Sequence, residues 1–348
     1  MVISHIFIQK IKHQGVSVMA DHRSTINDVA KRAGVSKSTV SRYLNGKGVR
    51  EGNYDRIKEA VAYYHFKANP FARLSAKRSN LIGVILPGFD STTTPRVLTA
   101  MDKYLRTKDY TPLFVNTEGD LDFEVRSLEN LERMRVDGII VVASYITQAH
   151  REQVARMDTP VVFFGQVFEG GVSVVNDDFA AGEALGLYVA GRGYRKAGCL
   201  WVTEQDEAVG KRRKEGILKG LAGCGVTGVR TWEADFTLQT AYTRAREILT
   251  GPDRPEVLLC ATDRIAYGVY KAARELGLRI PEDIAVTGFG GYETSELMTP
   301  PLTTVCFDVE TAACVCADTV LKLLEDEPVS QTQLVGYHCI PGDRKSVV

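Results

Sequence analysis

The first apolar pattern in the chain has helical spacing. Its positions recur at i, i+3, i+4 and i+7, which places them on one face of a short helix. Thr25 stands before them as an N-cap, and Asp28 three residues later completes a capping box. The apolar positions are Ile26, Val29, Ala30 and Ala33.

A second short helix is expected after a tight turn at Gly34. Ser36 is a good N-cap for it, and Val40 and Leu44 supply one apolar face. A third helix, around Asn53 to Tyr64, closes a three-helix core with Tyr54, Ile57, Val61 and Tyr64. Two short helices across a tight turn predict a helix-turn-helix, and spacing alone leaves a plain helical hairpin as the alternative.

From Leu81 onward the pattern changes to short apolar runs that alternate with longer helical segments. Continuous Val/Ile-rich strands separated by helices predict parallel sheets covered on both faces. About ten such units exceed one sheet, so we expect two doubly wound lobes with a ligand site at the strand C-termini. The runs include L-I-G-V-I-L-P, P-L-F-V-N, G-I-I-V-V-A, V-V-F-F-G, V-S-V-V-N, C-L-W-V, V-L-L-C-A and I-A-V-T-G-F.

Charge is distributed unevenly along the 348 residues, although the formal net charge is +0. Residues 20 to 80 carry 13 Lys plus Arg against 5 Asp plus Glu, a net of +8, and residues 81 to 348 carry a net of −10. A basic module joined to an acidic one points to a polyanion partner for the first. A solvated basic surface is the alternative that composition leaves open.

The seven cysteines are odd in number and lie mostly in apolar stretches, so we expect free thiols in a reducing, cytoplasmic setting. Cys314-Val-Cys316 lacks the spacing of a zinc site, and no metal or cofactor is expected. No apolar run is long enough for a membrane span. Residues 1 to 18 do not resemble a signal peptide, and we expect translation to start at Met19.

Catalytic patterns are missing from the sequence. It has no G-x-S-x-G elbow and no P-loop, and Gly288-Phe289-Gly290-Gly291 is a short glycine-rich stretch that most often marks a turn. A binding protein is therefore expected rather than an enzyme.

The polar face of the second helix has the residue types that read DNA. Lys37 and Ser38 occupy its N-terminal turn, which enters the major groove in a helix-turn-helix. Thr39, Ser41 and Arg42 are better placed for phosphates, which set the register rather than read the bases.

The string T-I-N-D-V-A-K-R-A-G-V-S-K-S-T-V-S-R-Y-L-N, Thr25 to Asn45, resembles the headpiece of the lactose-repressor (LacI/GalR) family almost position for position. The resemblance implies that Lys37 and Ser38 are the principal base readers. It implies an all-α helix-turn-helix headpiece and a two-lobed, doubly wound core like the type I periplasmic binding proteins. The supporting DNA contacts are then Thr25, Ser36, Thr39, Ser41, Arg42 and Asn45.

The domain boundaries follow from the same resemblance. We expect an N-terminal extension over residues 1 to 23, a DNA-binding domain over 24 to 67, a hinge over 68 to 80 and an effector-binding and dimerisation core over 81 to 348. In this family the hinge inserts a leucine into the minor groove, and Leu74 is the candidate. The hinge is one residue shorter than in typical members, which leaves the register of Leu74 open. An apolar residue that packs between headpiece and core is the alternative for Leu74.

The candidate effector contacts follow family positions in the core. Arg213 matches the effector-binding arginine, and it can fork onto hydroxyls or an anion. Lys211 and Arg212 beside it suit an anionic effector or form a solvated basic turn. The further candidates are Asp263, which has a helix-capping alternative, Phe164, which has a core alternative, Thr94 and Phe307.

Two positions depart from the family pattern. Many members have Gly-Tyr-Asp-Asp where this chain has Gly288-Phe289-Gly290-Gly291, so the carboxylate that grips ligand hydroxyls is replaced by Gly290. Phe307 falls where some members carry a polar ligand residue. We therefore expect a ligand that is held differently from those of the familiar members.

These features together predict a transcriptional repressor of a carbohydrate-utilisation operon that is a homodimer, with a tetramer as the alternative. It would bind double-stranded operator DNA and be released by a small sugar or sugar phosphate. An activator, a regulator that uses a co-repressor or protein partner, and a sugar-processing enzyme with a DNA-binding appendage are the alternatives.

Overall fold

The computed structural model describes residues 25–44, 48–66, 78–89 and 91–342. The chain divides into two compact units, residues 1–76 and 77–348, which are described separately. None of the helices in these described ranges is long and apolar enough to cross a membrane.

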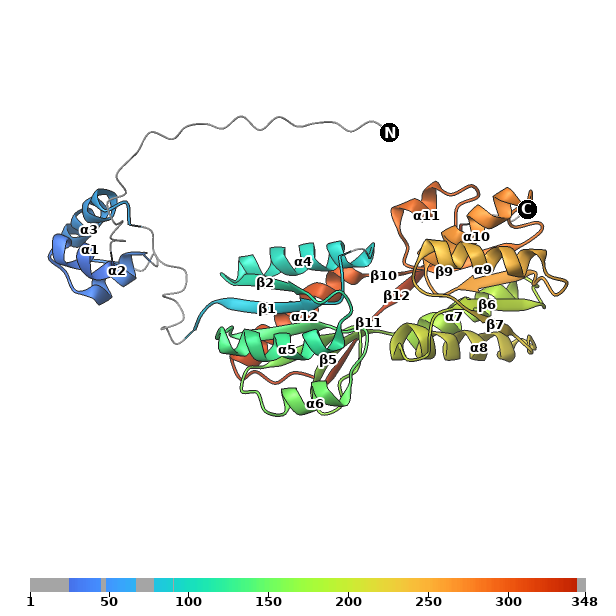
Figure 1. Ribbon diagram of the computed structural model, residues 1–348, viewed down its shortest axis with the longest axis horizontal. Helices are drawn as coiled ribbons and strands as arrows, with labels where there is room; N and C mark the ends of the chain where they lie inside the picture. Colours follow the sequence, from blue (N-terminus) through green and yellow to red (C-terminus); the bar gives the residue numbers. More distant parts are fainter. Residues whose placement is uncertain (1–24, 45–47, 67–77, 90, 343–348) are drawn as a thin grey trace, which may run out of the picture. The chain divides into compact units, whose positions relative to one another are not determined.

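The first unit is a headpiece of three short helices (Figure 1). The predicted capping box is confirmed, because the Thr25 hydroxyl accepts from the Asp28 amide while the Asp28 carboxylate accepts from the Thr25 amide at 2.7 Å. Gly34, with φ of +63°, ends the first helix in the left-handed conformation that glycine adopts without strain. The helices are α1 (Ile26–Ala33), α2 (Lys37–Leu44) and α3 (Glu51–Tyr63).

The headpiece core differs from the expected one on its third helix. Ile57 is buried as expected, but Ala60 lies beside it, whereas Tyr54 is 48% exposed. The tyrosine turns its ring edge to Tyr43 instead, with 5.0 Å between the ring centroids. The prediction for Tyr54 was wrong because small alanines let the helices approach closely, which excludes a large ring from the centre. The buried residues are Val29, Ala30, Ala33, Val40, Ile57 and Ala60.

The second unit begins with a lobe built on a parallel sheet in the order β11-β5-β4-β3-β1-β2. Its elements are β1 (Leu81–Leu86), α4 (Thr93–Thr107), β2 (Thr111–Asn116), α5 (Leu121–Arg133), β3 (Gly138–Val142), α6 (Gln148–Val154), β4 (Val161–Phe164), β5 (Val172–Asn176), α12 (Val309–Leu324) and β11 (Thr332–Val335). Helices α4 and α12 pack on one face of this sheet, and α5 and α6 cover the other. Alternate residues of β1 therefore enter two separate cores, which is why its run is apolar throughout.

The second lobe repeats the plan with a sheet in the order β12-β10-β9-β8-β6-β7. Its elements are α7 (Asp178–Gly191), β6 (Ala197–Trp201), the π-helical turn η2 (Glu207–Arg212), α8 (Arg213–Gly223), β7 (Arg230–Glu233), α9 (Leu238–Thr250), β8 (Val257–Cys260), α10 (Asp263–Glu275), β9 (Ala285–Phe289), α11 (Glu293–Leu297), β10 (Thr303–Phe307) and β12 (Tyr337–Ile340). Helices α7 and α8 lie below the sheet in Figure 1, and α9 and α10 lie above it. All neighbouring strands pair in parallel except β10 and β12.

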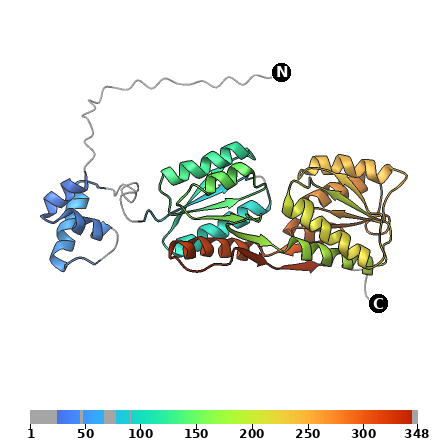
Figure 2. The same ribbon diagram turned by 90° about the horizontal axis from the view of Figure 1, so that it is seen from below.

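The chain passes between the lobes after β5, after β10 and between β11 and β12 (Figure 2). The loops that follow the strands of one lobe contact those of the other. Thr93 Oγ1, after β1, lies 3.1 Å from the Tyr292 hydroxyl, after β9. Gln166 Nε2, after β4, donates to Asp206 Oδ1, after β6, at 2.9 Å. The strand C-termini of the two lobes therefore face one another, and we call this region the interlobe face.

Helices α7 and α8 touch along glycines. A Cβ added at Gly182 would lie 2.1 Å from the Arg213 carbonyl oxygen, and one at Gly186 would lie 2.5 Å from the Ile217 oxygen. In return, Cβ atoms at Gly216 and Gly220 would lie 2.1 and 2.3 Å from backbone oxygens of α7. The two backbones are thus in direct contact, and this fixes the first residues of both helices relative to each other.

The two-lobed fold class is confirmed, but the apolar pattern missed three of the four strands at the sheet edges, β7, β11 and β12, whereas it predicted the edge strand β2. The three missed strands have four residues each and are mostly exposed or half-buried, so they lack the continuous apolar run of the central strands.

We expect Gly186→Ala to lower the stability of the second lobe by about 1 to 3 kcal/mol, because the added methyl group would push α7 away from α8. Urea unfolding followed by the fluorescence of the buried Trp201 measures this. Gly191→Ala, at the open end of the same helix with no atom near the added Cβ, is the matched control. It should be neutral or stabilising by about 0.5 to 1 kcal/mol, and equal effects of the two variants would contradict the close contact.

Candidate functional site

The recognition surface of the headpiece is the N-terminal turn of α2. Lys37 and Ser38 are both exposed there. The Ser36 hydroxyl accepts from the Thr39 amide at 3.2 Å and lies 2.8 Å from the Ser38 hydroxyl. Ser36 thus caps the helix, and its bond to Ser38 holds that side chain on the exposed turn.

The supporting DNA residues fall into two groups. Arg42 is exposed, Ser41 and Thr39 are half-buried, and Thr25 is exposed at the cap of α1. Asn45 and Leu74 lie outside the residues that the structure describes, as does the expected start at Met19.

Arg213 is the first residue of α8 and lies buried beneath the interlobe face. Its Nε and Nη2 donate to Asp178 Oδ1 at 2.8 and 2.6 Å, and its Nη1 donates to the Ala261 carbonyl at 2.7 Å. A guanidinium has five N–H groups, so one remains on each terminal nitrogen. Those two groups can donate to oxygens of a ligand.

Two aromatic rings flank this guanidinium. Its Cζ lies 4.6 Å from the ring centroid of Phe289 and 5.1 Å from that of Phe307, and the two rings are stacked with an interplanar angle of 16°. Phe289 ends β9 and Phe307 ends β10. Cation–π attraction to both rings therefore helps to hold the arginine beside these strand ends.

A rare π-helical turn, η2, comes directly before Arg213. Asp206 caps this turn by accepting from the Val209 amide at 2.9 Å. The Trp201 indole donates to the carbonyl oxygens of Val209 and Gly210 at 3.1 and 2.9 Å. A Cβ at Gly210 would lie 1.9 Å from the Thr203 oxygen, so only glycine allows this approach. Such turns are frequent at functional sites, because they reposition the residues that follow.

Burial governs the ionisation of the carboxylates here. Burial raises the pKa of Asp178, and the charge and hydrogen bonds of Arg213 oppose that rise. Burial likewise raises the pKa of Asp263, against hydrogen bonds from Thr304 and Ser295. The ion pair between Arg213 and Asp178 thus keeps two buried charges neutral as a unit.

The structure places the remaining predicted effector residues in different surroundings. Phe307 adjoins Arg213, whereas Phe164 and Thr94 are buried in the first lobe. Lys211 and Arg212 are about half exposed and pair with Glu207 and Glu215 at 3.1 and 3.4 Å.

Asp263 is fully buried, and its carboxylate accepts from Ser295, Thr304 and the Tyr292 amide. Its partners all lie within the second lobe. The N-cap of α10 is Thr262, not Asp263, because the Thr262 hydroxyl accepts from the Ile265 amide at 3.3 Å. In this structure Asp263 therefore supports the loop before α11.

Several residues of the site were not predicted from the sequence. Asp178 follows Asp177 directly after the run V-S-V-V-N, so a carboxylate at a strand end was a signal that could have marked it. No such pattern marked Trp201, Asp206 or Tyr292, since only the folded chain brings them close to Arg213 or to the other lobe.

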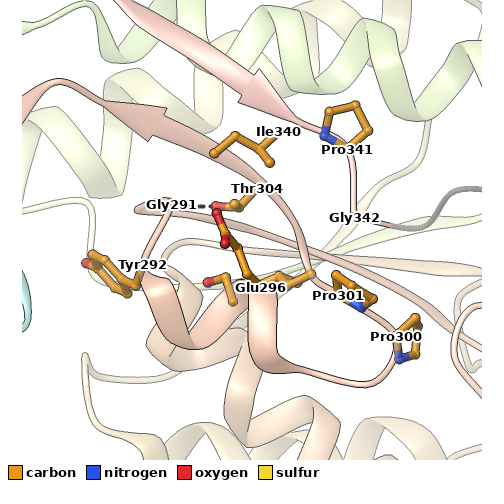
Figure 3. Close-up of a pocket in the computed structure, with 11 residues that line it drawn as sticks. Gly291, Tyr292, Glu296, Pro300, Pro301, Thr304, Ile340, Pro341 and Gly342 are labelled. Carbon is orange, nitrogen blue, oxygen red and sulfur yellow. Dashed lines mark hydrogen bonds between the residues drawn. The ribbon is translucent and has the colours of Figure 1, made fainter.

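A hollow of about 530 Å³ opens on the second lobe, beside the interlobe face (Figure 3). It lies between the start of α11, the Pro300–Pro301 turn and the end of β12. None of the predicted effector residues lines it, and its apolar walls lack the guanidinium. The hollow therefore shares no lining residue with the surroundings of Arg213.

A headpiece that presents a DNA-reading helix, together with a two-lobed core that holds a polar site at its strand ends, defines the class of ligand-responsive transcription regulators. The profile for bacterial regulatory proteins of the lacI family matches residues 25–69. The profile for periplasmic binding protein-like domains matches residues 187–346.

Known proteins agree with this class. The chain is 30% identical over 311 residues to the sucrose operon repressor of Staphylococcus xylosus, which covers 89% of this chain and 97% of that protein. It is 29% identical over 289 residues to the ribose operon repressor of Escherichia coli K12, over 81% of this chain and 87% of that one. The lac repressor dimer bound to operator and the anti-inducer ONPF has the same fold, with a TM-score of 0.83 at 23% identity over 91% of this chain and 98% of that chain. The chain belongs to the lacI family of bacterial regulatory proteins, and it is a transcription regulator rather than an enzyme.

We expect Asp178→Asn to destabilise the second lobe by about 3 to 5 kcal/mol, because it leaves the Arg213 charge buried without a partner. Trp201 fluorescence during urea unfolding reports the loss. Asp177→Asn is the control, since asparagine also caps a helix and Asp177 caps α7. A loss below about 1 kcal/mol for Asp178→Asn would mean that the ion pair is not required.

Proposed function

We propose that this protein represses a carbohydrate-utilisation operon and leaves its operator when a small sugar binds at the interlobe face. The observation that carries the proposal is the environment of Arg213. Two of its N–H groups are not used by Asp178 or Ala261, and the oxygens of a sugar bound at the interlobe face could accept from them. The names of the sucrose and ribose operon repressors support the same substrate class.

An uncharged sugar fits better than a sugar phosphate. Lys211 and Arg212, the cations that would attract a phosphate, are each paired with a glutamate at the surface. Arg213 is already neutralised by Asp178. The site thus offers hydrogen-bond donors without a surplus of positive charge.

The DNA half of the proposal rests on the exposed turn of α2. Lys37 and Ser38 read bases in the major groove, while Arg42, Ser41 and Thr39 hold phosphates. We place the DNA-binding domain at residues 24–67 and a hinge at 68–80, with Leu74 as its minor-groove wedge.

Regulation then follows from a population shift between two arrangements of the lobes. A sugar that contacts both lobes favours one arrangement of the lobes. In a dimer of two chains, that arrangement weakens the binding of the two headpieces to the operator. We propose a homodimer because operator half-sites related by two-fold symmetry need two headpieces.

Lys37→Ala should relax the preference for one operator base pair, at a cost of about 1 to 3 kcal/mol, because a lysine that donates to a base edge is lost. Operator selection followed by fluorescence anisotropy on single-base variants measures it. Lys58→Ala, an exposed lysine on α3, is the control for lost charge. An equal, sequence-independent loss in both variants would assign Lys37 to the phosphate backbone instead.

Arg213→Lys should weaken the response to the inducing sugar more than about 10-fold while operator affinity is kept, because lysine retains the charge but lacks the fork. Release of operator DNA by sucrose and by ribose, each titrated against the complex, provides the readout. Arg212→Lys, one residue earlier on the surface, should respond like the parent. If Arg213→Lys loses operator binding and keeps its sugar response, the assignment fails.

A further inference from the structure

Tyr292 belongs to the second lobe but contacts the first. Its hydroxyl lies 3.1 Å from Thr93 Oγ1, at the N-terminal end of α4. The two residues are 199 positions apart and both are half-buried. Burial raises the pKa of Tyr292, so its hydroxyl keeps its proton near neutral pH and can donate.

Two supports hold the tyrosine in this position. Its amide donates to the Asp263 carboxylate at 3.3 Å, and Ser295 donates to the same carboxylate at 2.7 Å. Asp263 thereby ties the loop before α11 to the core of the second lobe. Figure 3 shows Tyr292 at the edge of that loop.

The second support is the pair of glycines before the tyrosine. A Cβ added at Gly290 would lie 2.6 to 2.9 Å from ring atoms of Tyr292, so the ring lies directly on the Gly290 backbone. Gly290 has φ of +146° and Gly291 has φ of +61°, and a Cβ at Gly291 would lie 2.5 Å from Cys306. A side chain at Gly290 would displace the ring, and one at Gly291 would collide with Cys306.

This packing gives a physical reason for the departure at Gly290. The family resemblance places a ligand-gripping carboxylate at this position, and an aspartate there would occupy the space of the Tyr292 ring. In this chain the ring of Tyr292 thus fills the space beside Gly290 in which a side chain at that position would lie.

We propose that Tyr292 is an interlobe latch, whose hydrogen bond to Thr93 holds the lobes together and so sets how tightly an effector is bound between them. The proposal rests on the proposed function, in that the effector binds at the interlobe face. Tyr292 is a positioning residue: it acts on the lobes, and it does not grip the ligand.

The size of the effect follows from one hydrogen bond. A net contribution of about 0.5 to 1.5 kcal/mol corresponds to a change of about 2- to 12-fold in the ratio of closed to open lobes. An effector that needs both lobes loses affinity in proportion to the fall in the closed fraction, which is at most this factor.

The test is a double-mutant cycle of Tyr292→Phe and Thr93→Val in the full-length protein, read by hydrogen exchange and by sugar binding. Each single change should speed exchange about 2- to 12-fold in the segment on the opposite lobe, residues 91–98 for Tyr292→Phe and 290–297 for Thr93→Val. The exchange rate of the double variant should be little higher than that of either single variant, because both changes remove the same hydrogen bond. Sucrose and ribose affinities, measured by calorimetry, should fall by the same factor in all three variants.

Tyr267→Phe is the matched control. It also removes a tyrosine hydroxyl from the α11 region, but that hydroxyl bonds Ser295 within the second lobe at 2.8 Å. Exchange in residues 91–98 should stay at the parent rate. Gly290→Asp should reproduce the Tyr292→Phe exchange pattern, because it displaces the ring.

Contrary outcomes are distinct. Additive single effects, or unchanged exchange in the opposite lobe, overturn the latch. A sugar affinity that falls for Tyr292→Phe and holds for Thr93→Val overturns it too, since the tyrosine would then contact the ligand itself. If the parent binds neither sugar, the proposed effector class fails, whereas the exchange measurements still decide the latch.

Discussion

A guanidinium buried at the start of α8 has to be neutralised where it lies, because an unpaired charge in a protein interior is strongly destabilising. Asp178, at the start of α7, supplies that neutralisation. The geometry of the second lobe holds the ion pair of Arg213 and Asp178 in place. Four glycines bring the two helix backbones into contact, and the π-helical turn that Trp201 holds leads directly into Arg213. The pair holds the Arg213 donors in a fixed position inside one lobe, and the effector that we propose would meet them preformed.

Contacts within a lobe and contacts between lobes differ in strength, and the difference suits a regulator. Inside the second lobe the site residues are buried, charged or in backbone contact, so they move together. Across the interlobe face the described contacts include single hydrogen bonds, such as those of Tyr292 and Gln166. A small ligand can shift an equilibrium only by its differential affinity for two states, and weak interlobe contacts keep the required difference small.

Much of the architecture was readable from local patterns. The capping box at Thr25 and the apolar spacing after it are confirmed in α1, and the runs L-I-G-V-I-L and I-A-V-T-G-F are buried strands. These features depend on residues that are near neighbours in the sequence, so the spacing of apolar positions predicts them directly. Tyr54 and the edge strands β7, β11 and β12 were misjudged or missed, since their surroundings depend on how distant helices and strands pack.

The sequence by itself determined the class of the protein: a helix-turn-helix with its polar recognition turn, a basic module joined to an acidic one, and a doubly wound core. Each of these features depends either on residues that are close together in the sequence or on the summed composition of a segment. Only the tertiary structure decided which groups surround Arg213, since Asp178 and Phe289 reach it from separate elements. It also gave Gly290 a meaning that sequence comparison could not, because the ring filling the space of its missing side chain belongs to Tyr292 and reaches across to Thr93. Contacts between distant residues arise from packing in three dimensions, and no spacing along the chain records them.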